Sequence, residues 1–225
     1  MIRTSTVEVI EELTDKQGTH VEDVVQRALN DAGLLKLVLE GLTSTNEAYR
    51  YNCSKVISRL SERYPERLYP EWKRFEALLK SKNSFHRAIA VYTIARLTRV
   101  DSGEKFAKIF RRYFDLLDDI SLMVARYVAQ SAGIIAKSKP ALANKITTEL
   151  LDVQNTHFDQ IRKDLIAGDA LRSFEQYFEK SHQKEKIVSL ARQLSRSKSP
   201  SAKKIARQFL KNPQLERKDK LSLGN

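Results

Sequence analysis

The chain has 225 residues, 41% of them hydrophobic, with only seven glycines and five prolines, a composition that allows a continuous core and disfavours an all-β or disordered chain. Its single Cys53 excludes an internal disulfide, and no apolar run approaches the length of a signal peptide or membrane span. Thirteen basic and three acidic residues follow residue 179, a net charge of +10 that leaves only +2 of the total +12 elsewhere. We therefore expect a soluble, cytoplasmic, monomeric protein with no membrane partner, and the charge favours a polyanionic one.

The first 30 residues predict a helical hairpin that covers the apolar end of the structure that follows. Thr19 and Glu22 have the spacing of a capping box, which would start the second helix of this hairpin. The apolar side chains of that helix recur on one face, and they are Val21, Val24, Val25, Ala28 and Leu29.

Five amphipathic segments then alternate with a second set of helices. The segments have apolar residues at i, i+3 and i+4, and they span residues 32–42, 70–80, 104–117, 140–153 and 184–196. In the second set, "RYNCSKVISRL" at 50–60 matches "RAIAVYTIARL" at 87–97 with an offset of 37 residues. A third copy begins at Ala125, and weaker copies begin at Arg162 and Lys203, although Asp169 stands in the large apolar position of the fourth.

The helices of the second set are expected to start at the residues that lie four positions before the first position of each copy. Four of these residues are good N-caps, whose side-chain oxygen accepts a free N–H of the first turn, and they are Asn46, Asn83, Ser121 and Ser199. Pro200 strengthens the last start, because proline suits the first helical position. In the fourth copy Phe158 occupies this place, so Thr156 or Asp159 would have to act as the cap.

A unit of two amphipathic helices that repeats every 37 to 41 residues cannot bury its apolar faces alone and must stack on its neighbours. The sequence therefore predicts an all-α fold, an α-solenoid of five antiparallel helix pairs with almost no strand. We expect residues 1–30 to cap residues 31–211 within a single domain, and residues 212–225 to form a basic frayed tail.

The pattern of arginine, small residue, large apolar residue and then alanine or glycine, preceded by a turn with Asn or Asp, resembles HEAT repeats of the armadillo-like class. The resemblance implies a superhelix with the first helices on the convex side and the second helices on the concave side. It also implies that turn residues and helix arginines bond across neighbouring repeats. On this chain that would assign Arg50, Arg87 and Arg162, and more weakly Lys203, to a structural ladder interrupted at Ala125.

Helical periodicity places a set of cations and two tyrosines on the exposed inner face of the second helices. Cations that follow phosphates, with rings available for stacking, are typical of nucleic-acid surfaces. The candidate polyanion-binding residues are Lys55, Arg59, Tyr92, Arg96, Arg99, Arg126, Lys137, Lys203, Lys204 and Arg207, with Tyr51 beside them.

No catalytic site is indicated: the four histidines lack paired-ligand spacing, Cys53 occupies a small buried position, and no cofactor or metal is expected. The leading hypothesis is a non-catalytic scaffold that binds a nucleic acid or protein partner through a basic concave face and basic C-terminal repeat. One alternative is a protein–protein adaptor with no nucleic-acid role. Another is a DNA-repair enzyme, since the fold resembles HEAT-like alkylpurine DNA glycosylases; these use tryptophans and an aspartate at the lesion, whereas Trp72 falls on a convex-type helix here.

Overall fold

The computed structural model describes residues 6–212, and within that range every regular element is helical. None of the helices in this range has both the length and the hydropathy that a membrane crossing requires. The chain divides into two compact units, unit 1 from Met1 to Ser102 and unit 2 from Gly103 to Asn225.

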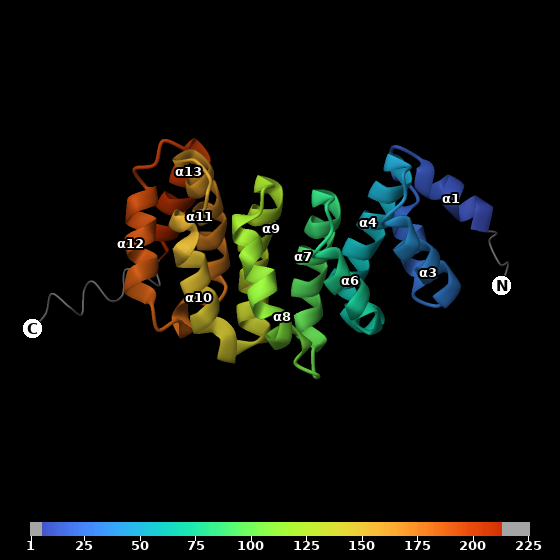
Figure 1. The fold of residues 1–225 in the computed structure, drawn as a ribbon, viewed down its shortest axis with the longest axis horizontal. Coiled ribbons are helices and arrows are strands. Elements are labelled where there is room, and N and C mark those ends of the chain that lie inside the picture. Colours follow the sequence, from blue (N-terminus) through green and yellow to red (C-terminus); the bar gives the residue numbers. More distant parts are fainter. Residues whose placement is uncertain (1–5, 213–225) are drawn as a thin grey trace, which may run out of the picture. The chain divides into compact units, whose positions relative to one another are not determined.

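Unit 1 begins with a helical hairpin and continues with two helix pairs (Figure 1). Its elements are α1 (Thr6–Thr14), α2 (Val21–Ala28), α3 (Ala32–Gly41), α4 (Glu47–Arg63), α5 (Pro65–Leu68), η1 (Tyr69–Glu71), α6 (Trp72–Leu78), α7 (Ser84–Leu97) and η2 (Thr98–Val100). The segment expected as one helix at 70–80 therefore begins in the 3₁₀ turn η1, and its α-helical part, α6, ends at Leu78.

Unit 2 contains three helix pairs, with 3₁₀ turns between several of the helices. Its elements are α8 (Lys105–Phe114), η3 (Asp115–Asp118), α9 (Leu122–Ser138), η4 (Pro140–Leu142), α10 (Ala143–Leu151), η5 (Asp152–Asn155), α11 (Gln160–Glu175), η6 (Phe178–Lys180), α12 (Lys184–Leu194) and α13 (Pro200–Leu210). The predicted five helix pairs are thus confirmed as an all-α solenoid of HEAT-like or armadillo-like repeats. The tail that we expected at 212–225 lies, apart from Asn212, outside the described residues.

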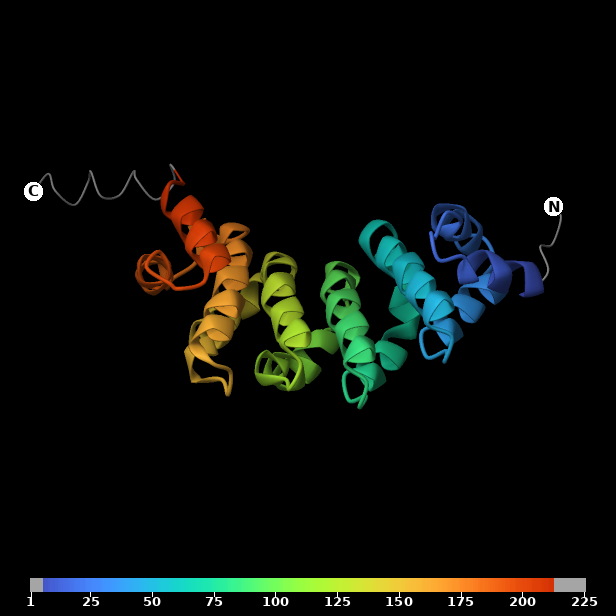
Figure 2. The same ribbon diagram turned by 90° about the horizontal axis from the view of Figure 1, so that it is seen from above.

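The second helices of successive repeats pack side by side within each unit: α4 contacts α7, and α11 lies between α9 and α13 (Figure 2). The predicted repeat positions form their cores. Cys53, Ile57 and Leu60 have no exposed surface, and neither do their equivalents in α7 and α9. Burying one large aliphatic side chain stabilises the fold by about 1.5–3 kcal/mol, so these positions define the register of the stack.

Four of the predicted helix starts are confirmed. The side chains of Asn46, Asn83, Asp159 and Ser199 each accept a backbone N–H of the first turn, from Tyr49, Phe85, Arg162 and Ala202 respectively. Ser121 takes the N-cap position of α9 but accepts no such hydrogen bond, so the side-chain cap predicted there is wrong.

The capping box predicted at Thr19 and Glu22 is also wrong. The N-cap of α2 is His20, which makes no side-chain cap, and the Thr19 hydroxyl donates to the Asp15 carboxylate at 2.8 Å. The Asp15 carboxylate also accepts a hydrogen bond from the backbone N–H of Thr19. The side chain that closes this turn is therefore Asp15, and Thr19 does not cap the helix. Four of the five residues predicted for the apolar face of α2 are buried, Leu29 lies just beyond the helix and is half-buried, and the hairpin packs against α4.

The arginine ladder is confirmed in its structural role at two positions but not in its predicted form. Arg50 donates to the carbonyl of Ser44 at 2.7 Å, and the buried Arg87 donates to the carbonyl of Ser81 at 2.7 Å. These bonds close the turn of the same repeat, because the guanidinium folds back over the carbonyls that precede its own helix. Arg162 does not belong to a ladder: it is exposed and lies 3.4 Å from Asp159 in its own first turn.

Candidate macromolecule-binding surfaces

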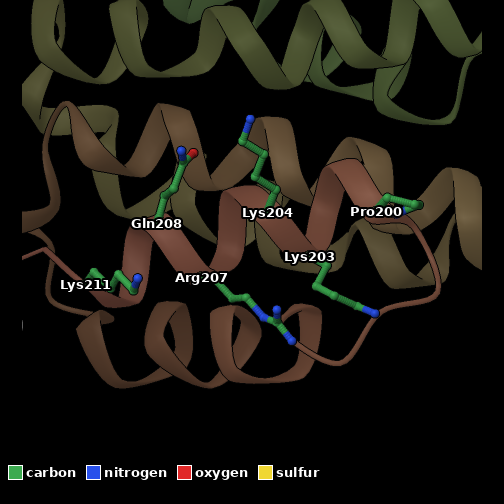
Figure 3. A pocket seen from close by; sticks show the side chains of 6 residues that line it. All are labelled: Pro200, Lys203, Lys204, Arg207, Gln208 and Lys211. Atoms are coloured by element: carbon green, nitrogen blue, oxygen red, sulfur yellow. The ribbon is translucent and has the colours of Figure 1, made fainter.

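The first candidate surface is one face of α13. Ser199 and Pro200 start this helix, and its opposite face is buried through Ala202, Ile205, Ala206 and Phe209. The six residues of the outward face line a hollow of about 380 Å³, and they are Pro200, Lys203, Lys204, Arg207, Gln208 and Lys211. Figure 3 shows Lys203 and Arg207 on one side of this face and Lys204 and Gln208 on the other. We call these six residues the α13 surface.

The α13 surface has an unbalanced charge. Four of its six residues are cationic, none is acidic, and the helix itself contains no Asp or Glu. The four cations make no ion pair with any described residue. Lys203, Lys204 and Arg207 were predicted, whereas Lys211 was missed, although its place four residues after Arg207 marks the same helix face.

The second candidate surface lies in unit 1, on α4, α7 and η2. Lys55 and Arg59 follow Tyr51 along α4, while Tyr92 and Arg96 lie on α7 and Arg99 on η2. Two of the cations rest on aromatic rings. Lys55 Nζ lies 4.5 Å from the ring centre of Tyr51, and Arg96 Cζ lies 5.2 Å from that of Tyr92. We call these six residues the unit 1 surface.

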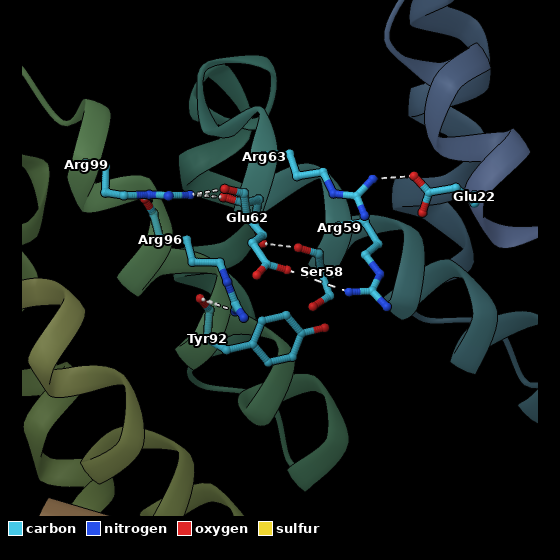
Figure 4. A network of polar contacts seen from close by, with 9 residues as sticks. Glu22, Ser58, Arg59, Glu62, Arg63, Tyr92, Arg96 and Arg99 are labelled. Carbon is cyan, nitrogen blue, oxygen red and sulfur yellow. Dashed lines mark hydrogen bonds and ion pairs between the residues drawn. The ribbon is translucent and has the colours of Figure 1, made fainter. Parts of the chain in front are cut away.

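Two arginines of the unit 1 surface, Arg96 and Arg99, donate to backbone carbonyls (Figure 4). Arg99 donates to the carbonyls of Ser61, at 2.8 Å, and Glu62, which are at the C-terminal end of α4. Arg96 donates to the carbonyl of Tyr92 at 3.1 Å. A helix C-terminus carries a partial negative charge and free carbonyls, so the end of α4 stabilises the Arg99 guanidinium in this position.

Carboxylates lie among these cations. Arg59 Nη1 is 3.8 Å from Glu62 Oε2, with both side chains about half exposed, and Arg63 pairs with Glu22 (Figure 4). The unit 1 surface therefore differs from the α13 surface, because it combines both signs of charge with tyrosine. Arg63, Glu62 and Glu22 were not among the predicted site residues.

The part of the predicted row that falls in unit 2 is only partly available. Lys137 is exposed, as expected. Arg126 is not a free groove residue, because its guanidinium donates to Asp169 through two bonds of 2.6 and 3.3 Å. The Asp169 side chain has no exposed surface. The aspartate that stands in the apolar position of the fourth repeat is thus the buried partner of Arg126. This hydrogen bond raises the pKa of Arg126.

Two side chains that were weighed for chemistry, Cys53 and Trp72, are buried. Burial raises the pKa of the Cys53 thiol to about 12, and Trp72 is only 1% exposed. Among the described residues no group of three His, Cys, Asp or Glu side chains is placed to hold a metal ion.

The fold and these two surfaces define a helical-repeat protein of the HEAT-like or armadillo-like type. No protein-family model matches the chain, and no curated protein matches it. Solved structures share its fold, among them three at 16% sequence identity. The Pds5–Scc1 complex matches 91% of this chain with a TM-score of 0.54, and the chain spans 30% of the length of the chain it matches there. An engineered protein and a designed armadillo repeat protein match 95% and 93% of this chain, and 93% and 94% of their own chains, each with a TM-score of 0.52.

Proposed function

We propose that the chain is a non-catalytic helical-repeat scaffold that binds the phosphate backbone of nucleic acid through its α13 surface. The observation that carries this proposal is the row of four cations on one helix face, none of them paired with a carboxylate of residues 6–212. Such cations repel one another. A polyanion relieves that repulsion and gains free energy by releasing its own condensed counterions.

The dimensions of the α13 surface fit this role. From Lys203 to Lys211 the helix rises about 12 Å, at 1.5 Å per residue. Duplex DNA carries one charge per ~1.7 Å of its axis, so a face of this length lies opposite several phosphates. The surface offers flexible cations and one amide, and it presents no ring for stacking on bases. We therefore expect binding with weak sequence preference.

A scaffold role also agrees with the fold relationship. One of the similar structures is a complex of Pds5 with Scc1, and stacked repeats in general present extended surfaces to partners. The glycosylase alternative finds no support, because the single Trp72 is buried and cannot stack on a base. The alternative of a protein–protein adaptor is supported by the mixed charges in and around the unit 1 surface.

The test is fluorescence anisotropy of a short labelled DNA duplex with the full chain at low salt. Two triple variants remove the same number of charges. Lys203→Gln, Lys204→Gln and Arg207→Gln change the α13 surface, whereas Lys73→Gln, Lys80→Gln and Lys108→Gln change exposed lysines on or next to the first helices of the repeats. We expect the first variant to lose affinity at least about tenfold, and the second to lose little.

Absence of binding at about 50 mM salt, or equal losses in the two variants, would contradict the proposal and leave the charge as a general solubility feature. Incubation of the same duplex after alkylation, followed by a strand-nicking assay, tests the non-catalytic part. Release of the damaged base by the full chain would make it an enzyme.

A further inference from the structure

A second hollow lies in unit 1, next to the unit 1 surface. It measures about 460 Å³ and is lined by Lys16, Glu47, Ala48, Arg50, Tyr51, Asn52 and Phe85. Its aromatic walls come from two repeats, because Tyr51 belongs to α4 and Phe85 to α7. We call it the α4 hollow, and Tyr51 is the residue it shares with the unit 1 surface.

The walls of the α4 hollow are fixed. Asn52 is 1% exposed and donates to the carbonyls of Leu13 and Asp15, at 2.9 and 2.6 Å, which ties α4 to the N-terminal hairpin. Arg50 Cζ lies 5.4 Å from the ring centre of Phe85, so the guanidinium supports this ring from behind the turn. Tyr51 is 54% exposed and offers its ring to solvent. The hollow thus combines a preformed aromatic lining with an open mouth.

The cations beyond the hollow follow a regular spacing. Tyr51, Lys55 and Arg59 are four residues apart on one face of α4, which places them about 6 Å apart along the helix axis. In an extended peptide, side chains two residues apart point the same way and lie about 6.6 Å apart. When an extended segment lies along α4, every second side chain of the segment therefore lies opposite the next of these three α4 residues.

We infer that the α4 hollow and the neighbouring cations form a docking site for an extended acidic segment of a partner protein. The segment has an apolar or aromatic residue in the hollow, and acidic residues two and four positions away, in either chain direction, opposite Lys55 and Arg59. This inference goes beyond the proposed function, because it concerns another surface and another class of partner.

The chemistry favours a carboxylate-bearing protein over nucleic acid at this place. Glu47 and Glu62 lie within the site and would repel a continuous phosphate backbone, whereas a peptide places its charges only where cations stand. Arginine and tyrosine are, with tryptophan, enriched in the energetic centres of protein interfaces. The Arg59–Glu62 contact of 3.8 Å is long and half exposed, so an incoming carboxylate can replace it.

Lys55 is also held in place before any partner binds. Lys55 Nζ rests on the Tyr51 ring and beside the turn at Gly18, where a Cβ would come within 2.9 Å of it. Gly18 has a φ of +67°, so this turn both requires glycine and leaves just enough room for the lysine. Side chains that are ordered beforehand lose less entropy on binding.

The experiment is selection of random displayed peptides against the immobilised full chain at physiological salt. We expect enrichment of peptides with an apolar or aromatic residue and acidic residues two and four positions away. An enriched peptide, synthesised and labelled, should bind the Lys55→Gln, Arg59→Gln double variant at least about tenfold more weakly, and Tyr51→Ala similarly. The matched control, Lys36→Gln with Lys73→Gln, removes two cations from outer helices of the same unit and should bind as the unchanged chain does.

A charge exchange makes the result independent of folding defects. Arg59→Glu should bind poorly to the selected peptide but recover affinity for a peptide whose matching acidic residue is replaced by lysine. No enrichment, enrichment without acidic residues, or binding that survives the Lys55, Arg59 and Tyr51 variants would overturn the inference. The α13 triple variant should leave peptide binding unchanged, so a failure here is distinct from a failure of DNA binding.

Discussion

Replacement of Arg126 should destabilise unit 2 far more than replacement of its partner Asp169. In Arg126→Met the Asp169 carboxylate keeps its fully buried place but loses the guanidinium that compensates its desolvation. Breaking a buried ion pair from one side costs about 3–5 kcal/mol. Because the Arg126 side chain is 35% exposed, we expect the lower end of that range, about 3 kcal/mol, or a fall in Tm of about 6–12 °C.

Asp169→Leu should be tolerated, because the partially exposed guanidinium of Arg126 can turn to water and leucine restores the apolar residue of the other repeats. We expect a loss of about 1 kcal/mol or less, and the double variant Arg126→Met, Asp169→Leu should lie within about 1 kcal/mol of the unchanged chain. Arg111→Met is the matched control. It breaks the pair with Asp115, which measures 2.8 Å, and the longer pair with Glu149, which measures 3.5 Å; because Arg111 is 76% exposed, the loss should stay below about 1 kcal/mol.

Urea unfolding followed by far-UV circular dichroism measures these free energies. The fluorescence of Trp72, which lies in α6 of unit 1, separates the response of that unit from the response of unit 2. The reasoning is refuted if Arg126→Met costs no more than Arg111→Met, or if Asp169→Leu costs as much as Arg126→Met.

Three further predictions concern single positions. Burial raises the pKa of the Cys53 thiol to about 12, so the native chain should react with thiol reagents only after unfolding, and rapid labelling of folded protein would contradict the repeat register. Gly133→Ala should destabilise by about 1–3 kcal/mol in urea unfolding, because its Cβ would lie 2.7 Å from the carbonyl oxygen of Ser173; an unchanged midpoint would argue against this close helix contact. The backbone N–H of His157 donates to Asp118 and lowers the pKa of its carboxyl below the usual 3.8. The ionised carboxylate therefore adds to the free energy of unfolding in full above pH 3.8, and this stabilisation is lost as the pH falls through the lower pKa of the folded state. In urea unfolding at acid pH, Asp118→Asn should show a weaker dependence of stability on pH than the unchanged chain.

The repeat register could be predicted from the sequence because local signals agreed with long-range ones. The N-caps at Asn46, Asn83 and Ser199 coincide with the 37- to 41-residue period, and small and large apolar residues recur at fixed distances after them. Cys53 falls in this pattern as a small core residue and is fully buried.

The pairing of Arg126 with Asp169 could not be predicted in the same way. The two residues are 43 positions apart, and the fourth repeat reads as degraded when its aspartate is compared with the apolar residues of the other copies. The pair becomes visible only when α9 and α11 are placed side by side, since the helix rotation decides which side chains meet.

The charge of the candidate surfaces could be predicted from the sequence, but the hydrogen-bond partners of their side chains could not. The net charge of +10 after residue 179 pointed to α13 directly. For Arg99, sequence periodicity gave an exposed position and could not show that the guanidinium donates to the carbonyls at the end of α4. Such bonds depend on where one helix ends relative to the next.

The most direct test of the scaffold proposal is the salt dependence of duplex DNA binding. For the unchanged chain, the logarithm of the association constant should fall linearly with the logarithm of salt concentration, with a slope of about −0.9 for each phosphate contact. Replacing Lys203, Lys204 and Arg207 with glutamine should flatten that slope by roughly two to three units, whereas replacing Lys73, Lys80 and Lys108 should change it by less than about one. Equal slopes for the unchanged chain and the Lys203, Lys204 and Arg207 variant would contradict the account, because the α13 surface would then make no phosphate contacts.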